Sequence, residues 1–216
     1  MSFIKKIESG KLLKRELLLP SIEGQILSSR LSENDLFSLE LYSLAKGESI
    51  SSHNLLELTL YVILSGKLDV SSQKLGAKEY FLATKDTSCE LFARDDTQVL
   101  IYTFKNDIEL RNIESNKVNT LASQIEYVCN TVSSKIILQK KELSLTLFSF
   151  DVDEGLSTHK ASGDAMVIPL EGSVFVKIDE IPYNVSEGDF IILPANIAHS
   201  LIGKTKYKML LTVVKS

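Results

Sequence analysis

The sequence predicts an all-β protein built from two copies of one barrel-like module, and three observations support this. The first half recurs in the second with a shift of 106 residues, which aligns His53 with His159. Short segments rich in β-branched, aromatic and leucine residues occupy matching places in the two halves. Turn formers such as Ala45-Lys46-Gly47 and Ser65-Gly66 separate these segments, and strong helical periodicity is scarce.

The internal repeat defines the domain organisation. The clearest matching groups are Ile7-Glu8-Ser9 with Ile113-Glu114-Ser115, Ser51-Ser52-His53 with Ser157-Thr158-His159, and Leu64-Ser65-Gly66 with Leu170-Glu171-Gly172. A period of 106 residues is too long for a solenoid unit, so each copy is interpreted as a domain. We expect an N-terminal domain of residues 1–106 and a C-terminal domain of residues 107–216, with the boundary near Phe104–Asp107.

The individual elements are expected to be short strands. In the first copy they are Phe37–Leu44, Leu58–Leu64, Lys67–Ser71, Tyr80–Ala83 and Val99–Phe104; in the second they are Leu145–Phe150, Met166–Pro169, Ser173–Ile178, Asp189–Leu193 and Tyr207–Val214. The best helical candidate is Lys117–Asn130. Because its counterpart in the first copy contains Pro20, we expect a turn or two of helix there at most.

A closed or double-sheet barrel used twice is the most economical architecture for this pattern, because it leaves few long strand edges unprotected. Several strands are apolar on both faces, as in Met209–Val214. Such strands fit a barrel interior on one side and a neighbouring segment on the other. We therefore expect the two copies to pack as a pseudo-twofold internal dimer. The protein would be a monomer containing this internal dimer, or a homodimer.

The composition excludes several classes of function. Hydrophobic residues make up 44% and charged residues 24% of the chain, which is ordinary for a soluble globular protein. The net charge of −4 provides no basic field for phosphate backbones, so nucleic acid is not an expected partner. The longest apolar runs are too short to span a membrane, and residues 1–6 lack the apolar core of a signal peptide. Two cysteines, Cys89 and Cys129, form no disulfide framework, so a cytoplasmic location is expected.

The second copy carries two motifs. The run from Gly188 through Pro194 to His199 resembles the second signature of the cupin superfamily. The stretch Gly155–Gly172 resembles the first, with His159 at its first histidine position. The chain is most similar to small uncharacterised conserved-barrel cupins. The resemblance implies two tandem (RmlC-like) jelly-roll β-barrels, a bicupin. It leaves the activity open, because cupins include isomerases, dioxygenases, decarboxylases, storage proteins and sensors.

In a full cupin centre, the resemblance implies three imidazoles and a carboxylate around a divalent metal. Here only His159 and His199 remain in register, because alanines stand at the second histidine and glutamate positions. Asp164 is a candidate third ligand, although strand alternation turns it inward only with a bulge. One interpretation is a single divalent metal (Zn, Fe, Mn or Ni) held by His159, His199 and Asp164. The other is a metal-free pocket with two hydrogen-bonded histidines at the barrel mouth.

The first copy carries a degenerate version of the same positions. His53 keeps the first histidine position, and Cys89 stands where the second copy has His199. We interpret this barrel as mainly structural and Tyr42 as a core residue. The alternative is a Cys–His pair that binds metal or activates a thiolate.

Three functions follow. The leading hypothesis is a bicupin that binds a small molecule in its C-terminal barrel, where small side chains leave room for a ligand. The second is a metal-dependent enzyme, an oxygenase or an isomerase, acting on a small polar substrate. The third is a non-catalytic structural or regulatory cupin. The residue types and their spacing do not distinguish among these three functions.

Overall fold

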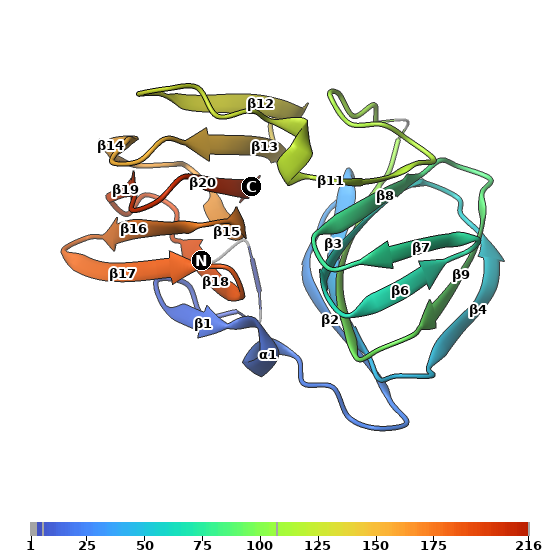
Figure 1. The fold of residues 1–216 in the computed structure, drawn as a ribbon. Coiled ribbons are helices and arrows are strands. Elements are labelled where there is room, and N and C mark those ends of the chain that lie inside the picture. The colour runs from blue at the N-terminus through green and yellow to red at the C-terminus, as the bar shows by residue number, and fades with distance from the viewer. Residues whose placement is uncertain (1–3, 6, 107, 216) are drawn as a thin grey trace. The chain divides into compact units, whose positions relative to one another are not determined.

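The computed structural model describes residues 4–5, 7–106 and 108–215 (Figure 1). Helical structure in these residues is limited to α1 (Arg15–Leu18) and the 3-10 turn η1 (Ala122–Gln124), and neither could cross a membrane. The strands are β1 (Leu12–Lys14), β2 (Ile26–Glu33), β3 (Phe37–Leu44), β4 (Ser49–Asn54), β5 (Leu58–Ser65), β6 (Lys67–Val70), β7 (Gln73–Gly76), β8 (Glu79–Ala83), β9 (Ser88–Ala93), β10 (Thr97–Phe104), β11 (Val118–Thr120), β12 (Val132–Gln139), β13 (Leu143–Phe150), β14 (Gly155–His159), β15 (Asp164–Glu171), β16 (Ser173–Ile178), β17 (Ile181–Ser186), β18 (Asp189–Leu193), β19 (His199–Gly203) and β20 (Tyr207–Val214).

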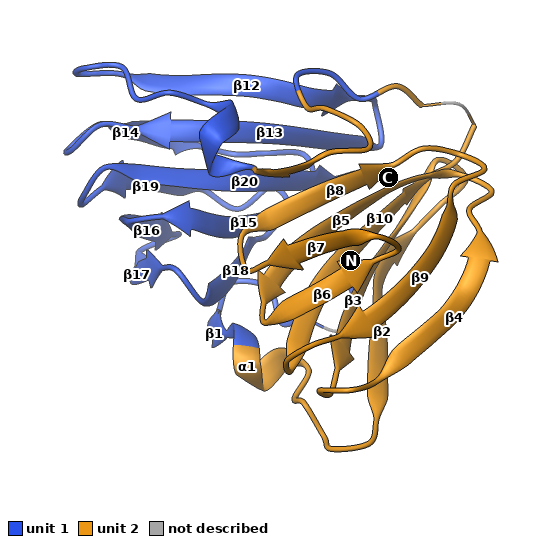
Figure 2. Ribbon diagram, turned by 45° about the vertical axis from the view of Figure 1, so that its right-hand side comes forward, with its two compact units in different colours: residues 1–15, 110–112, 121–216 blue, residues 16–109, 113–120 orange. Residues whose placement is uncertain are grey.

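The chain forms two compact units (Figure 2). Unit 1 contains Met1–Arg15, Leu110–Asn112 and Leu121–Ser216, and unit 2 contains Glu16–Glu109 and Ile113–Thr120. Each unit has one six-stranded and one four-stranded sheet of antiparallel pairs. Their orders are β1-β18-β15-β20-β13-β12 and β14-β19-β16-β17 in unit 1, and β11-β8-β5-β10-β3-β2 and β4-β9-β6-β7 in unit 2. The prediction of an all-β protein with two double-sheet barrels is confirmed.

The units differ from the contiguous halves 1–106 and 107–216 in one respect. β1 belongs to unit 1, where Leu12 pairs with Ile191 of β18. Its counterpart in the second repeat, β11, belongs to unit 2, where Val118 pairs with Phe81 of β8. Without these short strands, β18 and β8 would be open sheet edges, and pairing satisfies their backbone groups. Asp107, next to the expected boundary, lies outside the described residues.

The exchanged segments keep the same local structure, which explains why their sequence recurs. In the first, Lys11 forms an ion pair with Glu8 at 2.8 Å, and Lys117 forms one with Glu114 at 2.9 Å in the second. The backbone N–H of Gly10 donates to the Ile192 carbonyl at 2.8 Å, and that of Asn116 donates to the Leu82 carbonyl at 2.8 Å. The repeated Ile-Glu-Ser-x-Lys motif therefore encodes the segment that closes a barrel edge.

The expected strands are present, and the unexpected ones include polar edge strands as well as β9 and β19, which lie inside the four-stranded sheets. Phe37–Leu44 and Tyr207–Val214 coincide with β3 and β20. Strands such as β4 were not expected, because the Ser49–Asn54 side chains are nearly all exposed and give no apolar alternation. The region Lys117–Asn130 contains β11 and η1 rather than a long helix.

Candidate functional site

His159 and His199 lie directly opposite each other in the four-stranded sheet of unit 1. His159 ends β14, His199 begins β19, and the two residues are register partners. A bulge shifts the pairing between Leu156 and His159 and brings the two histidines into line. Their ring centroids are 4.5 Å apart, with an angle of 66° between the planes. The structure thus brings together the two imidazoles that the sequence analysis singled out.

Both rings are oriented by the backbone two residues before them. His159 Nδ1 lies 2.8 Å from the Ser157 carbonyl oxygen, and His199 Nδ1 lies 2.9 Å from that of Ile197. Because a carbonyl oxygen can only accept, each Nδ1 carries the proton and donates it. In the neutral ring, this leaves each Nε2 as a lone-pair acceptor.

The two histidines differ in their exposure to solvent. His159 is exposed, whereas His199 is 2% exposed. Burial lowers the pKa of His199, since removal from water disfavours the charged imidazolium; the hydrogen bond to Ile197 opposes this, and the neighbouring His159 adds to it. His199 is therefore held as a neutral acceptor.

Asp164 does not join the histidines. Its Oδ2 accepts a hydrogen bond from the backbone N–H of Ile4 at 3.1 Å, and its Oδ1 accepts one from that of Ala195 at 3.0 Å. The next residue, Ala165, belongs to the apolar cluster of unit 1, so regular alternation keeps the carboxylate off that face. The described part of the chain contains no group of three or more His, Cys, Asp and Glu side chains placed to hold a metal ion. The three-residue metal site expected from the sequence is therefore not assembled.

The corresponding positions of unit 2 repeat the geometry without the second imidazole. His53 and Cys89 are register partners after a bulge in the β4–β9 pairing, and His53 Nδ1 lies 3.1 Å from the Ser51 carbonyl oxygen. Cys89 is fully buried, and its sulfur is 3.2 Å from the Tyr61 hydroxyl. Burial raises the pKa of the Cys89 thiol despite that hydrogen bond, which is opposite to what thiolate activation requires.

Unit 2 also contains a cavity of about 430 Å³ that the sequence analysis did not anticipate. It is lined by the following residues: Glu40, Tyr42, Ile50, His53, Asn54, Leu55, Leu56, Glu57, Thr59, Tyr61, Leu91, Ile101 and Thr103. Tyr42, interpreted from sequence as a core residue, lines this space beside Glu40. The spacing of Glu40 and Tyr42 could have indicated this, because residues two apart on a strand lie on the same face and a glutamate shares that face with the tyrosine.

Neither the family models nor the curated protein sequences give a match to the chain. Among solved structures, the chain is similar to a cupin 2 conserved barrel domain protein from Leptotrichia buccalis. The identity is 28% over 99% of this chain and 100% of that chain, with a TM-score of 0.82.

Two more distant structures share the fold alone. Protein Ylba from E. coli is 16% identical over 94% of this chain and 89% of that chain, with a TM-score of 0.60. A variant of salicylate 1,2-dioxygenase from Pseudoaminobacter salicylatoxidans is 10% identical over 99% of this chain and 86% of that chain, with a TM-score of 0.64. With its two double-sheet barrels, the chain has the two-domain cupin fold that its motifs indicated.

Proposed function

We propose that this bicupin binds a small molecule in its C-terminal unit through the paired imidazoles of His159 and His199. The observation that carries the proposal is that both Nδ1 atoms are committed to backbone carbonyls, which leaves two acceptor nitrogens on rings 4.5 Å apart. Two neighbouring acceptors favour a ligand that supplies hydrogen-bond donors, such as an amide, an amidine or a polyol.

A divalent metal bridging the same two nitrogens is the second candidate. It is favoured by the Nδ1–carbonyl hydrogen bonds, because metal-ligating histidines commonly orient their second nitrogen in this way. Two imidazoles supply only part of a coordination shell, and the Asp164 carboxylate is held by backbone amides. The residues present thus do not fit a tightly held resident metal, and a metal-dependent enzyme would need its other ligands from the substrate or water.

The two candidates can be separated because the chain has only three histidines. Protein with ¹⁵N-labelled histidine would be titrated with uncharged donor-bearing fragments (amides and polyols) and, in a separate sample, with ZnCl₂. We expect at least one fragment to shift the Nε2 signals of His159 and His199 together and to leave His53 unchanged. Binding should weaken about tenfold or more in His199→Ala, as expected for loss of a buried hydrogen-bonding partner.

The matched control is His53→Ala, which removes the corresponding histidine of unit 2 and should leave fragment binding intact. Fragment shifts confined to His53, or to one of the two paired histidines, would refute the shared site. If the protein holds stoichiometric zinc that resists chelation, and His199→Ala loses this zinc, the metal-dependent function is favoured over direct binding of the ligand.

We place this activity in the cytoplasm, without nucleic acid or membrane as partner. Both cysteines are free thiols, Cys89 buried and Cys129 exposed. This supports a reducing compartment, where exposed thiols persist unpaired. Alkylation of thiols in intact cells checks the point: Cys129 should be recovered in its alkylated form by mass spectrometry, and a disulfide at Cys129 would contradict a reducing compartment.

A further inference from the structure

The interior of unit 2 changes from apolar to polar along the barrel. Register partners on three neighbouring strands, β3, β10 and β5, form successive layers of side chains across the sheet. The first layer contains Tyr42, Val99 and Ile63. The second contains Glu40, Ile101 and Tyr61, and the third contains Ser38, Thr103 and Thr59. The cavity lies on this polar side, with Tyr61, Leu91 and Thr59 buried beneath it and His53, Asn54 and Leu56 exposed at its rim.

The same layers in unit 1 are mostly apolar. The positions that match Tyr42, Thr59 and Thr103 in the repeat hold Phe148, Ala165 and Val213, and all three contribute to the apolar cluster of that unit. The residue that matches Glu40 is Thr146. Burying a carboxylate inside a barrel lowers the stability of the fold compared with an apolar side chain at the same position. Because unit 1 has a mostly apolar interior, the fold itself does not require Glu40, and its presence indicates a role in binding.

Two hydroxyl donors of the cavity lining are committed to acceptors of the protein itself. The Tyr42 hydroxyl donates to Glu40 Oε2 at 3.2 Å, and the Thr59 hydroxyl donates to the Glu57 carbonyl at 3.1 Å. Two glutamates, Glu40 and Glu57, are among the residues that line the space, and the lining residues include neither lysine nor arginine. A ligand that donates hydrogen bonds and carries positive charge complements such a surface.

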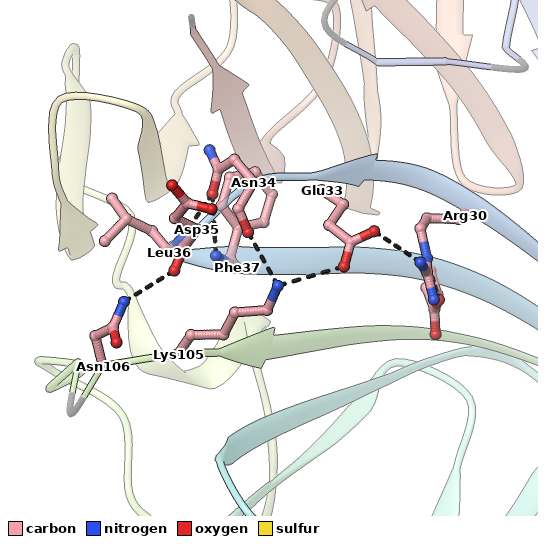
Figure 3. A network of polar contacts seen from close by, with 9 residues as sticks. Arg30, Glu33, Asn34, Asp35, Leu36, Phe37, Lys105 and Asn106 are labelled. Carbon is pink, nitrogen blue, oxygen red and sulfur yellow. Dashed lines mark hydrogen bonds and ion pairs between the residues drawn. The ribbon is translucent and has the colours of Figure 1, made fainter.

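Arg30 orients Glu40 from outside the cavity lining. Its Nε donates to Glu40 Oε1 at 2.7 Å, and its Nη1 donates to Glu33 at 2.7 Å. Glu33 in turn accepts from Lys105 at 3.3 Å, in a network around the β2–β3 turn (Figure 3). The Arg30 side chain is 56% exposed, whereas that of Glu40 is 19% exposed, so water screens the arginine charge more than the carboxylate. Each Glu40 oxygen retains a second lone pair for a ligand in the cavity.

We propose that the unit 2 cavity binds a small organic cation, an ammonium group on an apolar body. The ammonium would donate to Glu40 beside the Tyr42 and Tyr61 rings, and the apolar body would lie against Leu55, Leu91 and Ile101. Tyrosine rings add a cation–π attraction, and the volume of about 430 Å³ lies within the range for small-molecule sites. This site is separate from the histidine pair of unit 1, and the proposal does not rest on the function proposed for that pair.

The test uses three probes that share one ring and differ only in charge: cyclohexylmethylamine, cyclohexylmethanol and cyclohexanecarboxylate. Affinity would be measured by titration calorimetry at pH 7.5 and the site read from the histidine ¹⁵N signals. We expect the amine to bind about tenfold or more tightly than the alcohol and the carboxylate not to bind. The signals of His53, at the cavity rim, should shift, and those of His159 and His199 should not.

Glu40→Gln keeps the shape and removes the charge, and it should weaken amine binding about tenfold or more. Glu33→Gln is the matched control, because Glu33 pairs with the same arginine but does not line the cavity; its effect should be under about twofold. Should Glu40→Gln fail to fold, Tyr42→Leu provides a second variant; it removes the ring beside Glu40 and is expected to weaken amine binding severalfold. Equal affinity for amine and alcohol, equal effects of the two glutamine variants, or shifts at His159 and His199 instead of His53 would each overturn the proposal.

Discussion

The Asp164 carboxylate accepts a hydrogen bond from the backbone N–H of Ala195, 3.0 Å away, and so fixes the turn that leads into His199. Its other oxygen accepts from Ile4, which belongs to the segment that carries β1. Asp164 therefore joins the first segment of unit 1 to the histidine-bearing turn, and it acts as a positioning residue rather than as a ligand.

Asp164→Asn tests this role. The carboxylate accepts two backbone N–H groups, and an amide in its place turns an NH₂ group toward one of them and leaves that buried N–H unpaired. We expect the free energy of unfolding to fall by about 1–3 kcal/mol. Urea denaturation measures this, with Asp35→Asn, an exposed aspartate, as the control. An unchanged midpoint would contradict the anchoring role.

His199 should make the stability of the protein depend on pH in the mildly acidic range. Its pKa in the folded protein is lowered by burial, so the unfolded chain binds the extra proton first. The free energy of unfolding should therefore decrease as the pH falls from about 6.5 toward the folded pKa, and this group should contribute no further loss below that value.

The measurement is urea unfolding between pH 7.5 and pH 5 for the wild type and for His199→Asn, in which the amide nitrogen can replace Nδ1. The variant should lose part of the slope. His53→Asn controls for removal of an imidazole with the same backbone hydrogen bond. A slope that persists unchanged in His199→Asn would show that other groups cause it.

The Gly66 turn between β5 and β6 should tolerate no side chain. Gly66 has a φ of +79°, and an added Cβ would lie 2.2 Å from the Asp96 carbonyl oxygen. Gly47 has a φ of +89° but open space around it, so it is a matched control for the backbone strain alone. We expect Gly47→Ala to cost about 1–2 kcal/mol of unfolding free energy and Gly66→Ala about 3 kcal/mol or more. Equal losses in urea denaturation would contradict the crowding at Gly66.

The two cysteines should react at different rates. Cys89 is fully buried, and burial raises the pKa of its thiol, whereas Cys129 is exposed. Iodoacetamide at pH 7.5 should alkylate Cys129 alone in the native protein and both residues in denaturant, as mass spectrometry of peptides would report. Labelling of Cys89 as fast as Cys129 under native conditions would rule out its buried position.

The architecture could be predicted from the sequence because the chain contains two copies of one barrel, and each copy supports the interpretation of the other. The alignment of the two copies equates His53 with His159 and Cys89 with His199, and the resemblance to cupin motifs implies that the two positions of each copy share a site. The structure has His53 with Cys89 and His159 with His199 as register partners. The exchange of β1 and β11 could not be predicted, because the Ile-Glu-Ser-x-Lys motif shows that the segment recurs but not which barrel edge it joins.

The site was only partly predictable for a similar reason. The motifs locate the two imidazoles, but the partners of Asp164 are backbone amides, which a sequence pattern does not display. The unit 2 cavity depends on Glu40 facing the interior, and the face of a strand is known only once its register is fixed.

The most direct test of the account is the tautomeric state of His159 and His199 at pH 7.5, read from ¹⁵N–¹H correlation spectra of the labelled side chains. The shared site requires both rings to carry their proton on Nδ1 and to present a bare Nε2. Nδ1–H tautomers at both residues are the predicted result. An Nε2–H tautomer or a charged imidazolium at His199 would contradict the proposal that the pair accepts from one ligand.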